Sequence, residues 1–74
     1  MAVRDLPIRG ESIRLGQALK LSGLAESGGE ARALIEDGAV TVNAKVETRR
    51  GRQLRHGDVV AVGEQALRIA ANAA

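Results

Sequence analysis

The sequence contains no phenylalanine, tryptophan or tyrosine among its 74 residues, although 45% of them are hydrophobic. A core must therefore be assembled from leucine, isoleucine, valine and alanine, and each large aliphatic side chain contributes about 1.5–3 kcal/mol when it is fully buried. A chain of this length buries about 60% of the surface that its unfolded form exposes. We therefore expect one domain over residues 1–74, of modest stability and without a large internal ligand cavity.

Cysteine is also absent, which excludes disulfide bonds and thiolate chemistry and fits a reducing compartment. The first ten residues contain no apolar run of signal-peptide length, and no segment is long and apolar enough to span a bilayer. We expect a cytoplasmic protein that has no membrane partner.

Groups that could support catalysis are few. The single histidine, His56, precedes the turn pattern Gly57-Asp58, and no third residue completes a catalytic arrangement with them. Histidine and carboxylate residues do not cluster at the spacing of metal ligands, and Gly28-Gly29 lacks the rest of a phosphate-binding P-loop. The sequence therefore predicts no enzyme activity, no metal, no cofactor and no small-molecule substrate.

What the sequence does contain is a short basic segment. Residues 45–56 have a charge balance of +4, whereas residues 1–44 and residues 57–74 each have a balance of −1. Within this segment, Leu54 is a lone apolar anchor. A local positive patch on a nearly neutral domain indicates a polyanionic partner. The alternative is a solvated arginine-rich loop that improves solubility.

The segment before it has the pattern of a capped helix that leads into a hairpin. Ser27 and Glu30 form the S-x-x-E pattern of a capping box at the start of a helix predicted over 28–37. Gly38 ends that helix, and Asn43-Ala44 predicts a two-residue hairpin turn. The other predicted elements are an edge strand over 3–9, a helix from 13 or 14 to 22 that ends at Gly23, strands over 39–42, 45–47, 59–62 and 66–70, and a frayed tail over 71–74.

The absence of aromatic residues limits how this chain can recognise nucleic acid. Proteins that bind single strands stack the bases on phenylalanine, tyrosine or tryptophan. Recognition by this chain would rest on phosphate and sugar contacts and on shape. We therefore expect a preference for folded RNA, such as ribosomal or transfer RNA, over unstructured strands, although charge alone does not exclude DNA.

A set of spaced residues resembles one family of small RNA-binding domains. These residues are Arg14-Leu15, Leu19, Ser27, Ala31-Arg32, Leu34-Ile35, Gly38, Val40, Val42-Asn43 and Gly57-Asp58. They resemble the domain named after ribosomal small-subunit protein four, whose core is called the alpha-L motif, over residues 13–62. Within that family the chain is most similar to free-standing bacterial members of one domain.

The resemblance implies an α+β fold in which two adjacent helices pack on a small antiparallel sheet of four to five short strands. It also implies that structured RNA binds to the helix pair and the adjoining basic loop, without catalysis. Two positions depart from the family, because Gly28 stands where many members have arginine and Ala44 stands where glycine usually completes the hairpin. The predicted RNA-binding residues are Arg14, Lys20, Arg32, Lys45, Arg49, Arg50, Arg52 and Arg55.

Two other functions stay open at this point. The basic loop could dock an acidic protein partner, with the edge strand near residues 6–8 pairing with it. Alternatively, the domain could act in trans as an accessory to an RNA-modifying enzyme or a translation factor. In each case we expect a monomer.

Overall fold

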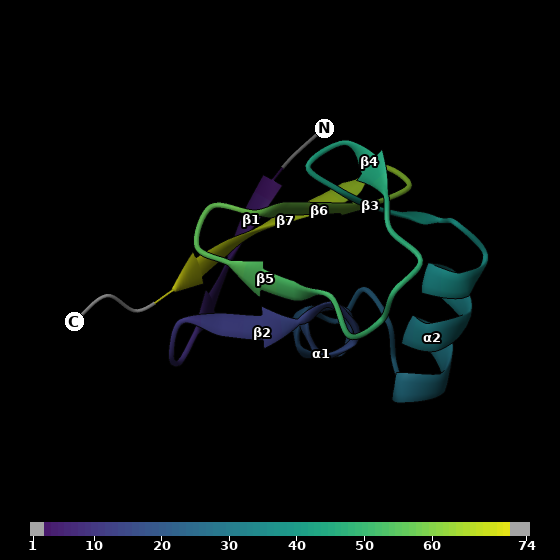
Figure 1. Ribbon diagram of the computed structural model, residues 1–74, viewed down its shortest axis with the longest axis horizontal. Helices are drawn as coiled ribbons and strands as arrows, with labels where there is room; N and C mark the ends of the chain where they lie inside the picture. The colour runs from purple at the N-terminus through teal and green to yellow at the C-terminus, as the bar shows by residue number, and fades with distance from the viewer. Residues whose placement is uncertain (1–2, 72–74) are drawn as a thin grey trace.

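A computed structural model describes residues 3–71 of the chain (Figure 1). Two helices and seven strands form within these residues, so the α+β class predicted from the sequence is confirmed. In chain order they are β1 Val3–Ile8, β2 Ser12–Arg14, α1 Leu15–Ser22, α2 Gly28–Glu36, β3 Val40–Val42, β4 Lys45–Val46, β5 Gln53–Arg55, β6 Val59–Val62 and β7 Gln65–Ala71.

Five of the strands form one sheet in the order β1-β7-β6-β3-β4, and β2 pairs with β5 in a separate two-stranded sheet. β1 is an edge strand, as its Pro7 predicts, and it runs parallel to β7, with Leu6 opposite Ile69. The main sheet is therefore mixed, whereas the family resemblance implied an antiparallel one. Two parallel neighbouring strands need a long connection, and the connection between β1 and β7 contains every other element of the domain. Local periodicity in the sequence does not reveal a pairing between strands so far apart.

The core lies between the five-stranded sheet and the two helices, which lie side by side (Figure 1). Its largest fully buried side chains come from both helices and from three strands of the main sheet, together with Leu54 of β5. The other fully buried large residues are Leu15, Leu19, Ile35, Val40, Val60, Leu67 and Ile69. The core is thus aliphatic, as the absence of aromatic residues requires.

Helix α1 begins later than the sequence predicted. Ile13 and Arg14 are in β2, where Ile13 lies opposite Leu54 of β5, and the helix starts at Leu15. Pairing with a strand about 40 residues away holds Ile13 and Arg14 in extended conformation, so the apolar helical pattern does not reach them. At the other end, Gly23 has a φ of 83° and caps α1 in the left-handed region, as predicted.

Helix α2 begins at the predicted cap. The Ser27 Oγ accepts a hydrogen bond from the backbone N–H of Glu30 at 3.1 Å. In a capping box the Glu30 carboxylate would accept from the backbone N–H of Ser27. Here it accepts instead from the N–H of the preceding residue, Glu26, at 3.3 Å. The helix ends at Glu36, and Gly38 follows with a φ of 76°, which confirms the predicted stop.

The predicted hairpin joins β3 to β4. Val42 pairs with Lys45, and the two turn residues Asn43 and Ala44 have φ values of 52° and 72°. β6 and β7 correspond to the strands predicted over 59–62 and 66–70. Ala71, expected in a frayed tail, is instead the last residue of β7, and residues 72–74 of that predicted tail lie outside the described residues.

Candidate nucleic-acid interface

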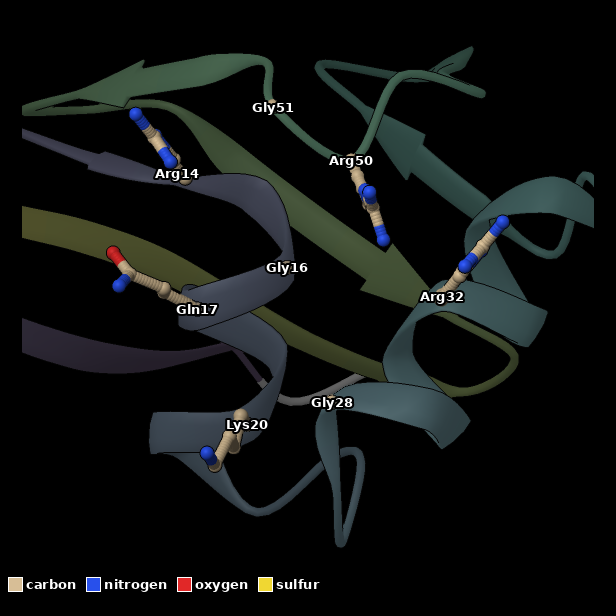
Figure 2. Close-up of a pocket in the computed structure, with 8 residues that line it drawn as sticks. All are labelled: Arg14, Gly16, Gln17, Lys20, Gly28, Arg32, Arg50 and Gly51. Atoms are coloured by element: carbon tan, nitrogen blue, oxygen red, sulfur yellow. The ribbon is translucent and has the colours of Figure 1, made fainter.

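Four of the predicted RNA-binding residues surround one hollow of about 380 Å³, which we call the basic hollow (Figure 2). Among the described residues that line it there is no aspartate or glutamate. The lining residues are Arg14, Gly16, Gln17, Lys20, Gly28, Arg32, Arg50 and Gly51. Cations without an acidic neighbour in the lining produce a local positive potential that attracts an anion.

The four cations come from four different parts of the fold. Arg14 ends β2 and precedes α1, Lys20 is on α1, Arg32 is on α2, and Arg50 is in the loop between β4 and β5. Figure 2 shows the Arg50 side chain extending from the loop toward α2, which carries Arg32, with Lys20 on the opposite side of the hollow. The fold therefore assembles positive charge from residues that lie up to 36 positions apart in sequence.

The backbone of the basic loop is tied to the start of α1. The N–H of Leu15 donates to the carbonyl oxygen of Arg52 at 2.8 Å, and the N–H of Gly16 donates to that of Arg50 at 3.0 Å. These bonds satisfy two of the donors that the first turn of any helix leaves without a partner. Arg50 is consequently held beside α1 by the fold itself.

Arg32 is oriented by a neighbour on its own helix. Its Nε donates to the Glu36 carboxylate at 2.9 Å, and the side chains of both residues are 57% exposed. An ion pair this exposed contributes about 0–1 kcal/mol. It positions the guanidinium group but leaves a phosphate able to compete for it.

A second group of predicted residues lies apart from the basic hollow. Lys45, Arg49 and Arg52 line another depression, together with Glu47. The Glu47 carboxylate accepts from the Nη1 of Arg52 at 2.9 Å and from the Nε of Arg49 at 3.1 Å. Its side chain is only 8% exposed. Two of the predicted phosphate-binding arginines thus hold an internal carboxylate.

The environment of Glu47 keeps it ionised. Hydrogen bonds from the side chains of Arg49 and Arg52, and then from the backbone N–H of Arg49, lower the pKa of Glu47 to about 2, although burial opposes this change. In the sequence, Glu47 was recognised only as one negative charge in the basic segment. Its position two residues before Arg49 and five before Arg52 was the available signal of this clamp.

The remaining predicted residue, Arg55, belongs to neither group. It lies exposed on β5, and its backbone N–H donates to the Asp58 carboxylate at 2.8 Å. The other carboxylate oxygen of Asp58 accepts from the side-chain Nδ2 of Asn43 at 3.0 Å. The side-chain Oδ1 of Asn43 in turn accepts from the backbone N–H of Val59 at 2.9 Å. Asn43 and Asp58, both part of the family pattern, therefore join two turns.

Gln17 also lines the basic hollow, although it was not among the residues predicted from the sequence. Arg14, Gln17 and Lys20 are three residues apart, and this spacing places side chains on one side of a helix. The spacing was therefore an available signal.

Residues 3–71 contain neither a cluster of metal ligands nor a helix that could span a membrane. No group of three or more histidine, cysteine, aspartate or glutamate residues in this range could hold a metal ion. Neither α1 nor α2 is long and apolar enough to cross a membrane. The exposed His56 accepts a hydrogen bond at its Nδ1 from the N–H of Ala71 at 3.1 Å, which gives it a structural contact.

Comparison with known proteins agrees with the pattern read from the sequence. The model of the S4 domain matches residues 6–70. The chain is also 46% identical, over 52 residues, to a protein of Bacillus subtilis (strain 168) named probable ribosome maturation protein RlbA. That alignment covers 70% of this chain and 73% of the relative. The extent of the family match leads to one conclusion: this chain belongs to the S4 domain family.

Proposed function

We propose that this domain binds folded RNA without catalysing a reaction, and that its phosphate contacts are centred on the basic hollow. The observation that carries the proposal is the placement of Arg14, Lys20, Arg32 and Arg50 around one hollow whose described lining contains no acidic residue. Contacts to phosphate dominate the affinity of most proteins for nucleic acid. Cations placed around a hollow favour a phosphate backbone of matching shape.

The family supports RNA as the partner, and the relative narrows the choice. S4 domain membership points to RNA binding, and the relative is named a probable ribosome maturation protein. Ribosomal RNA is therefore our first candidate, ahead of transfer RNA, and its binding would place the domain in the cytoplasm. An acidic protein partner could use the same cations, and so the test must compare classes of ligand.

The test is a titration of the purified domain with a folded ribosomal RNA fragment, a transfer RNA, a single-stranded RNA and a duplex DNA at several salt concentrations. Four phosphate contacts predict that log K falls with log salt at a slope of about −3 to −3.5. We expect the folded RNAs to bind most tightly. Equal, weak binding of all four nucleic acids would contradict the proposal and favour an acidic protein partner.

A pair of matched variants tests the position of the site. The double substitution Arg32→Gln with Arg50→Gln should weaken binding of the folded RNA about 10- to 30-fold and reduce the salt slope by about 2. Arg68→Gln is the control, because Arg68 lies on β7, is 54% exposed and also forms a salt bridge, with Asp5. It removes the same kind of charge away from the hollow. Equal losses in the two proteins would mean that net charge alone drives binding.

A further inference from the structure

Two apolar residues, Ile13 of β2 and Leu21 of α1, lie together at the surface beside the basic hollow. Leu21 is 61% exposed. With the half-buried Ile13 it lines an open depression of about 520 Å³, and Gln17 and Lys20 complete its lining. This volume falls within the range of about 300–1,000 Å³ that is common for small-ligand sites. We call the depression the apolar shelf.

The apolar shelf and the basic hollow are continuous. Gln17 and Lys20 line both of them. In Figure 2 these two side chains project from α1 away from Arg32, so they lead from the cluster of cations toward the shelf. A ligand whose phosphates occupy the basic hollow would pass directly onto Ile13 and Leu21.

We propose that the apolar shelf receives one unpaired base of the bound RNA, which packs on Ile13 and Leu21 while the adjoining phosphates contact the basic hollow. This inference rests on the proposed function and adds a recognition site to it. Specific recognition of RNA commonly uses bases that have left the helical stack. Such bases are held against aromatic or apolar side chains, and this chain has only apolar ones to offer.

Gln17 provides the polar part of the site. Its side-chain amide presents both a donor and an acceptor, which is the combination needed to hydrogen-bond the edge of a base. It stands between the cations and the two aliphatic residues, where a base on the shelf would present its edge. The site therefore combines an apolar face, a polar edge reader and cations for the backbone.

The size and charge of the shelf favour a base over a protein partner. A standard protein interface buries about 800 Å² on each side, whereas Ile13 is half-buried and Leu21 is 61% exposed, so together they expose less than the area of two side chains. The nearby cations are Lys20 and, in a neighbouring depression that also contains Ile13 and Leu21, Arg9. A small apolar surface between positive groups matches a nucleotide, which is flat, partly apolar and negatively charged.

The experiment uses three synthetic RNA hairpins that share one sequence except at a single position. One hairpin carries a single unpaired nucleotide, the second carries an abasic nucleotide at that position, and the third is fully paired. The abasic hairpin retains the phosphates and loses only the base. Affinities are measured by fluorescence anisotropy for the natural protein, for Leu21→Ser and for Val3→Ser. Val3 is the control, because it is 46% exposed at the far end of β1 and lines neither the hollow nor the shelf.

We expect the natural protein and Val3→Ser to bind the hairpin with an unpaired base about fivefold more tightly than the abasic hairpin. Leu21→Ser should bind the two hairpins equally, with the affinity for the abasic hairpin and its salt slope unchanged. Gln17→Ala should reduce the same preference without changing the salt slope, which separates the base contact from a phosphate contact.

Two results would overturn the inference while leaving the proposed function intact. One is tight, salt-dependent binding of the natural protein to both hairpins with no preference for the base. The other is an unchanged preference in Leu21→Ser, which would leave the shelf as a surface for an apolar peptide. Failure of the natural protein to bind any folded RNA would reject both proposals. Thermal denaturation followed by circular dichroism verifies that each variant is folded.

Discussion

The Arg52 guanidinium group donates a 2.9 Å hydrogen bond to the Glu47 carboxylate, whose side chain is 8% exposed. Arg49 donates hydrogen bonds to both oxygens of the same carboxylate. The most basic segment of the chain is therefore organised around its own buried acid. Two of the five cations in residues 45–56 are thus already engaged with Glu47, the one acid that the balance of +4 includes.

Replacement of the acid should destabilise the domain at neutral pH. Glu47→Gln removes a carboxylate held by two guanidinium groups, and we expect a loss of about 1–3 kcal/mol in the free energy of unfolding. Because the pKa of Glu47 is lowered from 4.5 to about 2 in the folded state, the stabilisation is fully present above pH 4.5 and is lost as the pH falls toward 2. Urea denaturation at a series of pH values measures this dependence.

The difference in the free energy of unfolding between the natural protein and Glu47→Gln should therefore become smaller below pH 4.5. Glu64→Gln is a suitable control, since Glu64 is exposed in the turn between β6 and β7. A constant difference from pH 7 to pH 2 would mean that the stability change comes from packing and not from the charge of the carboxylate.

Neighbouring arginines in the basic loop should have different roles. Arg50 lines the basic hollow, whereas Arg49 is bonded to Glu47. Arg50→Gln should weaken binding of folded RNA and reduce the magnitude of the salt slope by about 1. Arg49→Gln should change the slope less and instead lower stability. Salt-dependent RNA titrations and urea denaturation of the two variants test this division, and identical effects of the two substitutions would contradict it.

Loss of the α2 cap should destabilise the helix that carries Arg32. Ser27→Ala removes the oxygen that accepts from the N–H of Glu30 at 3.1 Å. Caps of this kind contribute about 0.5–2 kcal/mol, and urea denaturation should detect a decrease in that range. Thr48→Ala, in an exposed loop position, should be nearly neutral. Equal stability of the two variants would show that tertiary packing alone sets the start of α2.

Features governed by local chemistry were predictable from the sequence. The Ser27 cap and the left-handed Gly38 mark the ends of α2, because both depend on the conformation of a few adjacent residues. β2 and β5 were not predicted. Each has three residues, which is too short for a pattern, and the pairing of Ile13 with Leu54 depends on the whole fold. Leu54 was recognised as an anchor, but its partner could not be.

The cationic residues of the candidate site could be predicted from the sequence, but which of them lie around the same hollow could not. Arg14 and Arg50 were selected as separate family positions, and the structure brings them to one hollow. Counting charges could not separate Arg50 from Arg49 and Arg52. An arginine that forms an internal ion pair and an arginine that is available to a ligand each add one positive charge to the count. The bonds of Glu47 in the folded domain distinguish them.

Truncation of the anchor beneath the basic loop should be strongly destabilising. Leu54 is fully buried, so Leu54→Ala removes apolar contacts and leaves a cavity beneath β5. We expect a loss of about 2–5 kcal/mol in the free energy of unfolding. Gln53→Ala, at the exposed neighbouring position, should change it little. Similar denaturation midpoints for the two variants would mean that β5 contributes little to the folded core.

The hairpin turn should become more stable when it receives the residue that the family usually has. Asn43 and Ala44 have φ values of 52° and 72°, so an alanine occupies the left-handed region. Residues that have a Cβ atom adopt this region at a cost in energy, whereas glycine does not. Ala44→Gly removes this strain, and after the greater freedom of glycine in the unfolded chain is included we expect a gain of about 0.5–1 kcal/mol. Asn43 keeps its bonds to Asp58 and Val59, so the register of the turn should persist.

Thermal denaturation measures this gain, which corresponds to an increase of a few degrees in Tm for a domain of this size. Ala39→Gly provides a control of opposite sign, because Ala39 has no positive φ and a glycine there only adds freedom to the unfolded chain. If Ala44→Gly lowered Tm as Ala39→Gly should, the left-handed turn would not be a source of strain. An increase would instead show that this chain retains a destabilising alanine at a position where the fold itself favours glycine.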